Sequence, residues 1–201
     1  MLRIVGYFSS VALAASIVLV APSSLVAQET PSQPSNAAMQ EMMKLMMPGE
    51  GHKFFTPMAG KWRGKMKIIN YTDPTAPAME SDTESQSKLI LGGRFLQEEA
   101  SGSVMGMPMQ RMSILGYDNV TKKYTLIFFS TTETATNIAT GTLDADGKTL
   151  TLRGEFIQSN GNEAFKNVIR IDGDTHVFES YRVMPDGREL KAVEQVMTRV
   201  K

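Results

Sequence analysis

The feature that most constrains the fold of this chain is a series of short segments that alternate polar and apolar residues, running from Trp62 to Lys201. Turn residues such as Asp144–Gly147, Ser159–Asn162 and Pro185–Gly187 separate these segments. Evenly spaced strands joined by tight turns are typical of antiparallel meanders that close on themselves. We therefore predict an all-β domain, an antiparallel meander barrel of about ten strands.

The alternation also predicts which side chains share a face of the sheet, because residues two apart in a strand point the same way. Between Phe165 and Ile171 one face carries apolar side chains and a single amide, Asn167. Between His176 and Val183 each face mixes apolar and polar side chains. An interior of apolar walls with a few polar groups is typical of a cavity for a small ligand.

The N-terminal segment is predicted to be a secretory signal peptide over residues 1–27. Arg3 precedes an apolar stretch from Val11 to Ala21, and small residues follow up to Ala27. This order of basic, apolar and small residues is typical of signal peptides. An uncleaved anchor helix is the alternative, but Pro22 ends the apolar stretch short of the roughly 20 residues that a span needs. We expect cleavage after Ala27, export to the periplasm or secretion, and no integral membrane segment afterwards.

Residues 28–50 are predicted to form a disordered linker followed by a short Met-rich helix. Residues 28–38 are rich in Pro, Ser, Gln and Asn and lack apolar periodicity. In residues 39–47 methionines recur at spacings of three and four, which places them on one helical face. Pro48-Gly49 ends this helix. The β-barrel domain is then predicted over residues 51–201.

Composition excludes two classes of function. The chain has 21 basic and 21 acidic residues, so it lacks the positive surface that nucleic-acid binding requires. It contains no cysteine, which excludes disulfides and thiolate chemistry. Stability must therefore come from the apolar core, which a domain of this size can supply.

The chain also carries the stretches HKFFTPMAGKW at 52–62, LILGGRFLQEE at 89–99, LGYDNVTKKYTLIFFS at 115–130 and GTLDADGKTLTLRGEF at 141–156. These stretches resemble the DUF1579 family, and their GGRFL and GYD pieces are the most specific. The resemblance extends over nearly the whole predicted domain. It implies a lipocalin-like (calycin-like) antiparallel barrel. The family is uncharacterised, so the resemblance implies no activity.

Methionines and histidines are the candidate metal ligands. Met105, Met107 and Met109 form an alternative copper(I) site, since thioethers are soft ligands, but methionine more often fills gaps in apolar surfaces. The two histidines, His52 and His176, could ligate a metal or a haem iron. No His-x-His or His-x₃-His spacing supports a metal site. We therefore expect no bound metal and no cofactor.

The carboxylates do not form a recognisable catalytic pair. Glu98 and Glu99 are adjacent in one predicted strand, so their side chains point to opposite faces. Solvated charge on the outer face is the more ordinary interpretation of these and the other strand carboxylates. A hydrolase whose carboxylates meet across strands is a third hypothesis. The serines and threonines at Ser130–Thr132, Thr134 and Thr136 lie in no GxSxG or SxxK motif, so they give no support to nucleophilic catalysis and a binding protein is favoured over an enzyme.

The leading hypothesis is that the barrel binds a small apolar or amphiphilic ligand. In it Arg182 or Arg94 anchors an anionic head through a bidentate contact. The expected lining residues are Trp62, Arg94, Tyr117, Phe128, His176 and Arg182. The alternative is a filled barrel that acts as a protein-interaction module through its Met-rich helix or an open strand edge.

Overall fold

The computed structural model describes residues 35–73, 75–159 and 161–201, and the predicted signal peptide and the first part of the predicted linker lie outside them. Two helices come first, α1 (Asn36–Met46) and the 3₁₀ helix η1 (Glu50–Met58). Ten strands follow: β1 (Gly60–Ile68), β2 (Met79–Ile90), β3 (Phe95–Val104), β4 (Met107–Asp118), β5 (Lys123–Ser130), β6 (Asn137–Leu143), β7 (Thr149–Phe156), β8 (Glu163–Asp172), β9 (Thr175–Val183) and β10 (Glu189–Arg199).

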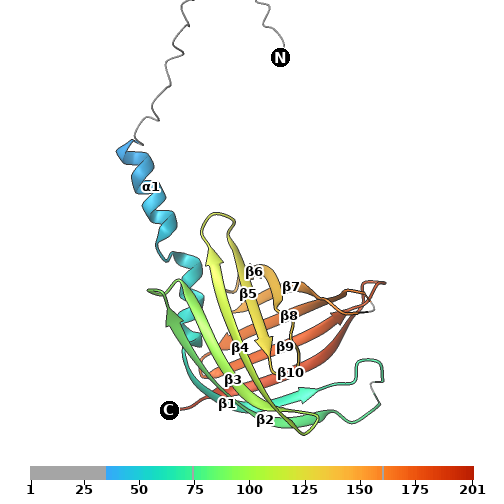
Figure 1. Ribbon diagram of the computed structural model, residues 1–201. Coiled ribbons are helices and arrows are strands. Elements are labelled where there is room, and N and C mark those ends of the chain that lie inside the picture. The colour runs from blue at the N-terminus through green and yellow to red at the C-terminus, as the bar shows by residue number, and fades with distance from the viewer. Residues whose placement is uncertain (1–34, 74, 160) are drawn as a thin grey trace, which may run out of the picture. The chain divides into compact units, whose positions relative to one another are not determined.

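The ten strands form a closed barrel in which each strand pairs antiparallel with its neighbours in the sequence (Figure 1). β1 completes the circle by pairing with both β2 and β10, so that Trp62 lies opposite Ser85 on one side and Arg199 on the other. The predicted antiparallel meander barrel of about ten strands with a short N-terminal helix is confirmed. Closure removes free sheet edges and separates an inner from an outer face.

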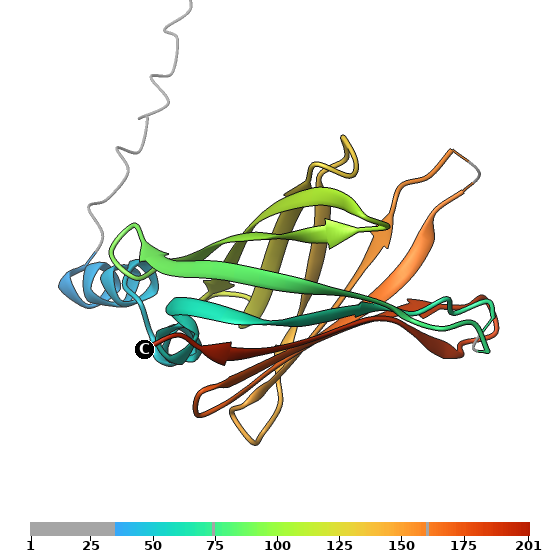
Figure 2. The ribbon, with the colours of Figure 1, turned by 90° about the horizontal axis from the view of Figure 1, so that it is seen from below.

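Helix α1 is attached to the barrel rim through its carboxyl-terminal end. Arg94 Nε donates a hydrogen bond to the carbonyl oxygen of Met46 (3.0 Å). Asn119 Nδ2 donates to the carbonyl oxygens of Leu45 (2.9 Å) and Met47 (2.8 Å). No residue of α1 is buried, and the helix extends away from the strands in both ribbon views (Figures 1 and 2). Neither helix in the described residues is long and apolar enough to cross a membrane.

Helix η1 packs into one end of the barrel. Phe54, Phe55 and Met58 are buried and belong to the same core cluster as the inner faces of the strands. Both phenylalanine rings lie edge-on to Tyr124 of β5, whose hydroxyl donates to the carbonyl oxygen of Gly51 (2.7 Å). Burial raises the pKa of this hydroxyl to about 12, so Tyr124 stays protonated and keeps this bond. The helix therefore closes that end against solvent.

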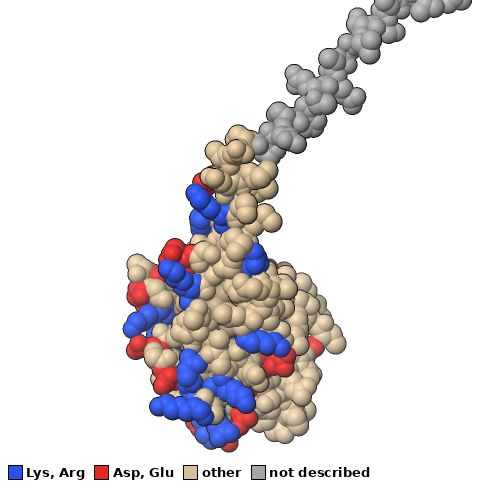
Figure 3. All heavy atoms as spheres, turned by 90° about the vertical axis from the view of Figure 1, so that its left-hand side faces the viewer, with Lys and Arg blue, Asp and Glu red and all other residues tan. Residues whose placement is uncertain are grey.

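The outer face of the barrel is charged and the inner face is mainly apolar. Cross-strand ion pairs join β1 to β2 on the outside, and their partners lie directly opposite in the register: Arg63–Glu84, Lys65–Asp82 and Lys67–Glu80. Figure 3 shows basic and acidic side chains interspersed on one side of the molecule. Such exposed pairs contribute little individually, so burial of the inner face dominates stability.

Strands β1 and β10 approach each other closely at Gly64, which lies opposite Met197. A Cβ atom added at Gly64 would lie 1.9 Å from the carbonyl oxygen of Val196. No side chain fits at that distance without moving the neighbouring backbone. Glycine is therefore required here because the two backbones lie too close together for a side chain, as is typical where strands bend in a barrel.

We predict that Gly64→Ala lowers the free energy of unfolding by about 3 kcal/mol, since the strands that close the barrel must separate. Urea unfolding followed by circular dichroism measures this loss. Gly102→Ala is the matched control, because its added Cβ would meet the nearest backbone atom, the carbonyl oxygen of Asp82, at 3.2 Å. An equal loss in both variants would contradict the account.

Candidate functional site

Four side chains that carry charged, amide or imidazole groups lie around one space inside the mainly apolar barrel. Glu98 of β3, Arg111 of β4, Asn167 of β8 and His176 of β9 line one interior cavity of about 50 Å³. Each occupies an inward position of its strand, between or beside apolar residues on the same face. The rest of the wall consists of Met58, Leu96, Ser113, Leu115, Leu126, Phe128, Ile169 and Phe178. We call this space the interior cavity.

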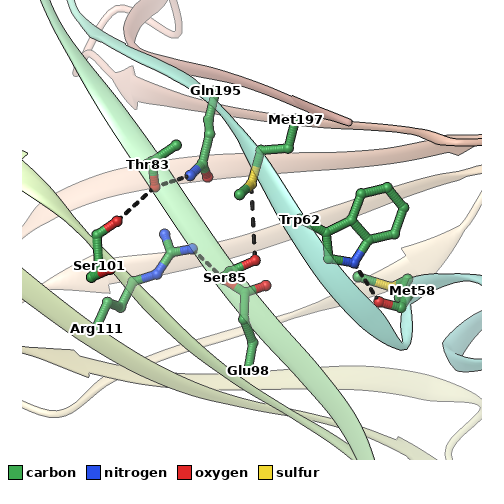
Figure 4. Close-up of polar contacts among 9 residues, drawn as sticks. All are labelled: Met58, Trp62, Thr83, Ser85, Glu98, Ser101, Arg111, Gln195 and Met197. Atoms are coloured by element: carbon green, nitrogen blue, oxygen red, sulfur yellow. Dashed lines mark hydrogen bonds and ion pairs between the residues drawn. The ribbon is translucent and has the colours of Figure 1, made fainter. Parts of the chain in front are cut away.

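Glu98 and Arg111 form a buried ion pair across β3 and β4 (Figure 4). Arg111 Nη2 lies 2.7 Å from Glu98 Oε1, and Glu98 is only 7 % exposed. The expectation that Glu98 belongs to the solvated outer face is therefore wrong. Its side chain shares a face with the buried Leu96 and Ala100, whereas that of Glu99 is exposed as expected.

The protonation states of the cluster follow from burial and from neighbouring charge. Burial alone would raise the pKa of Glu98, but the Arg111 guanidinium and then His176, with the hydrogen bond from Arg111, outweigh it and hold that pKa below its ordinary value. Burial lowers the pKa of His176, and the attraction of Glu98 offsets this only in part. At pH 7 the site thus holds an ionised Glu98, a cationic Arg111 and a neutral His176.

Three of these side chains have a buried polar atom without a hydrogen-bond partner among the described residues. The atoms are Arg111 Nε, Asn167 Oδ1 and His176 Nε2. Two other buried atoms also lack a hydrogen bond, Ser81 Oγ and Arg182 Nε, although Arg182 Nε is within ion-pair distance of Glu163. Neither residue lines the interior cavity. Each such atom destabilises the fold by about 1–3 kcal/mol, so three around one cavity are unusual for a closed core.

A second polar group in the interior is, by contrast, internally satisfied. Gln195 Nε2 donates to Thr83 Oγ1 (3.0 Å), and Thr83 Oγ1 donates to the carbonyl oxygen of Ser101 (3.1 Å) (Figure 4). Ser85 Oγ lies 4.0 Å from Met197 Sδ on the same side of the barrel. Three of the five buried polar atoms without partners in the described residues therefore belong to the wall of the interior cavity, and none belongs to this second group.

Two of the residues expected to line a ligand site do line the interior cavity, and a third packs against one of its wall residues. Phe128 and His176 belong to its wall. Trp62 packs edge-to-face on His176, with ring centroids 5.6 Å apart, and donates from Nε1 to the carbonyl oxygen of Met58 (2.9 Å). Trp62 thus helps to hold the His176 ring in position without itself lining the cavity.

The other three expected lining residues lie elsewhere. Arg94 holds the end of α1 at the rim, and Tyr117 packs against Tyr124 under η1. Arg182 pairs with Glu163 (Nε to Oε2, 3.0 Å) and lies over the ring of Phe156, 4.5 Å from its centroid. None of the three lines the interior cavity.

The candidate metal ligands are also separated. Met105 and Met107 are exposed near the β3–β4 turn, whereas Met109 is buried. His52 Nδ1 accepts a hydrogen bond from the amide of Gly49 (3.0 Å) at the start of η1. In residues 35–201, apart from 74 and 160, no three or more His, Asp or Glu side chains are grouped as metal ligands.

Sequence reasoning missed Glu98, Arg111 and Asn167 as site residues. Asn167 was placed on the apolar face of its strand, and Glu98 could have been placed there from Leu96 and Ala100. Arg111 shares a face with the buried Met109 and Leu115, but only the register of β3 and β4 brings it beside Glu98.

A larger hollow of about 800 Å³ lies on the outer face of β1–β5. Its floor includes Trp62, Ser85 and Ala100, whose buried side chains point inward, so their backbone forms the floor. The walls are exposed side chains of both charges, including Arg63 and Glu84. The hollow is open to solvent, whereas the interior cavity is enclosed by buried side chains, so the interior cavity is the better candidate site.

Fold and site together define a class: a closed antiparallel barrel with a partly unsatisfied polar cluster in its core. The chain belongs to the family described as "Protein of unknown function (DUF1579)", whose model matches residues 47–199. The structure also resembles that of Rv2717c from M. tuberculosis, with a TM-score of 0.57 and 18 % sequence identity over 77 % of this chain and 100 % of that one. At that identity the likeness supports the barrel fold alone. No curated protein matches the chain.

We predict that Asn167→Leu raises the free energy of unfolding by about 1 kcal/mol, because it removes a buried polar atom without a partner and keeps the side-chain volume. Urea unfolding measures the change as a shift of the midpoint at constant slope. Asn137→Leu is the control: this second buried asparagine donates to Glu133 Oε1 (2.7 Å), so its loss should destabilise. Destabilisation by Asn167→Leu as well would show that its amide is satisfied.

The Glu98–Arg111 pair predicts an acid-sensitive contribution to stability. Because the folded pKa of Glu98 is below its ordinary value of 4.5, this contribution is present above pH 4.5 and is lost as pH falls through the folded pKa. We expect Glu98→Gln to lower stability by about 3 kcal/mol at pH 7 and by less at pH 3, where part of the contribution has been lost. Urea midpoints across that pH range test this, with the exposed Glu99→Gln as control. The same loss at both pH values would contradict the pairing.

Proposed function

We propose that this protein is an exported carrier that binds a small amphiphilic molecule in the interior cavity. The observation that supports the proposal is the set of three buried polar atoms without partners, Arg111 Nε, Asn167 Oδ1 and His176 Nε2, on the wall of one cavity. A bound polar group that forms hydrogen bonds with these atoms would remove the free-energy penalty of leaving them buried without partners. Export rests on the pattern of residues 1–27.

The remaining wall supports an amphiphile. Leu126, Phe128 and Phe178 provide apolar surface next to the polar cluster. A pocket of mainly hydrophobic side chains with a few convergent polar groups is the usual form of a small-molecule site. A ligand would place its polar end toward Arg111 and Asn167 and its hydrocarbon part against the phenylalanines.

The size of the cavity limits the ligand. One buried water needs roughly 10–15 Å³ of cavity volume, so the cavity of about 50 Å³ admits a molecule of about three to five non-hydrogen atoms. A haem is far too large for it. Glu98 is the one carboxylate on the described wall, so the hydrolase hypothesis gains no second carboxyl group here.

A second candidate function, protein interaction, is favoured by helix α1. Its exposed side chains include Met39, Met42, Met43, Leu45 and Met46, and none of its residues is buried. Flexible methionine side chains suit adaptable contact surfaces. This function involves α1, whereas ligand binding involves the barrel interior.

We predict that acetamide and 1-propanol, each of four non-hydrogen atoms, bind with dissociation constants in the millimolar range, as expected for such small ligands. The chain has two histidines, so ring ¹H–¹³C spectra give two resolvable reporters. The His176 signals should shift on titration and those of His52, outside the cavity, should not. Asn167→Leu should weaken binding at least about 10-fold, since it removes a buried hydrogen-bond partner, and Asn137→Leu should not.

No shift of His176 with any small neutral probe would overturn the proposal and leave ordered water as the occupant of the cavity. Equal shifts of both histidines would indicate nonspecific surface binding and would also overturn it.

A further inference from the structure

The charges around the interior cavity are balanced. Glu98 is anionic and Arg111 is cationic, and the two lie 2.7 Å apart. His176 is 5 % exposed and neutral at pH 7. No other charged residue lines the cavity in the described part of the chain. The site as a whole therefore carries no net charge.

This balance disfavours a charged ligand. An anion would have to lose its hydration and compete with Glu98 for Arg111, and a cation would have to compete with Arg111 for Glu98. In either case one buried charge would be left without a full partner. A neutral ligand can enter without disturbing the pair.

The polar atoms without partners specify the hydrogen bonds that such a ligand must make. Arg111 Nε is a donor and needs an acceptor. Asn167 is only 2 % exposed, and its side chain makes no hydrogen bond among the described residues. The side-chain amide offers one acceptor and one donor group whichever way it is oriented. Neutral His176 adds one ring nitrogen of each kind. The ligand must therefore carry both an acceptor and a donor.

Resting on the proposed function, we infer that the ligand is a small neutral molecule in which a carbonyl acceptor and an N–H donor are adjacent, the chemistry of a short primary carboxamide. Within about three to five non-hydrogen atoms, few other groups present both kinds of hydrogen bond together with an apolar end. The carbonyl oxygen accepts from Arg111 Nε. The N–H group donates to Asn167 Oδ1 or to His176, and the alkyl end faces Phe128 and Phe178.

Three probes of nearly the same planar shape and of four non-hydrogen atoms each test this class: acetamide, acetate and acetamidinium. At pH 7 they are neutral, anionic and cationic. Titrations followed through the His176 ring signals, with His52 as internal reference, should give acetamide an affinity at least about 10-fold higher than that of either ion.

The variant Glu98→Gln reverses the expected order. It keeps the size of the side chain and removes the negative charge, so Arg111 is left free to pair with an anion. Acetate should then bind at least about 10-fold more tightly than in the unaltered protein and should surpass acetamide. Glu99→Gln, one residue along on the outer face, should keep the original order.

The outcomes separate this inference from the proposed function. If none of the three probes shifts His176, the proposed function fails. If acetate or acetamidinium binds the unaltered protein as tightly as acetamide, ligand binding stands and the carboxamide class is wrong. The same holds if Glu98→Gln is folded and does not gain affinity for acetate. The ranking of the probes on the unaltered protein remains decisive even if Glu98→Gln does not fold.

Discussion

The pairing of β1 with β10 is the constraint on which the rest of the structure depends. It closes the sheet into a barrel, and η1 then packs into one end with Phe54, Phe55 and Met58 buried. Together they separate the interior from water. Only in such an enclosed space do a carboxylate, a guanidinium, an amide and an imidazole interact strongly with one another, because solvent no longer screens them.

Because the Glu98–Arg111 pair is enclosed, it adds little net stability to the fold, which makes a functional role the better explanation for it. Desolvating two charges is unfavourable, and their mutual attraction offsets this fully only when the remaining hydrogen bonds are made. Here Arg111 Nε remains without a partner. Two apolar side chains of similar volume at these positions would make the fold as stable or more stable. Local arrangements that lower the stability of the fold in this way are typical of functional sites.

The sequence predicts the fold well and the site only in part, for physical reasons. Strand alternation and turn residues are local properties, so the meander and its number of strands follow from them. Alternation and residue type indicate that Trp62 and His176 face the interior, and both are buried, whereas the charge of Arg94 and Arg182 suggests an anchor for an anion without fixing where either side chain lies. Their positions depend on where each strand ends, and Arg111 meets Glu98 only through the register of β3 with β4. Register and cavity volume depend on contacts between distant segments, which one sequence does not display.

The resemblance to lipocalin-like barrels suggests a roomy interior, yet this one is nearly filled. Phe128, Phe156 and Phe165 pack against one another inside it, with centroid distances of 4.3–6.3 Å. With so little volume left, shape can reject large molecules but cannot distinguish small ones of equal size. Discrimination among those must come from buried polar groups, since an analogue that leaves a hydrogen bond or a charge without its partner loses far more affinity than one that differs by a methylene. Glu98, Arg111, Asn167 and His176 form such a set, so selectivity in this barrel depends on charge and hydrogen bonding more than on size.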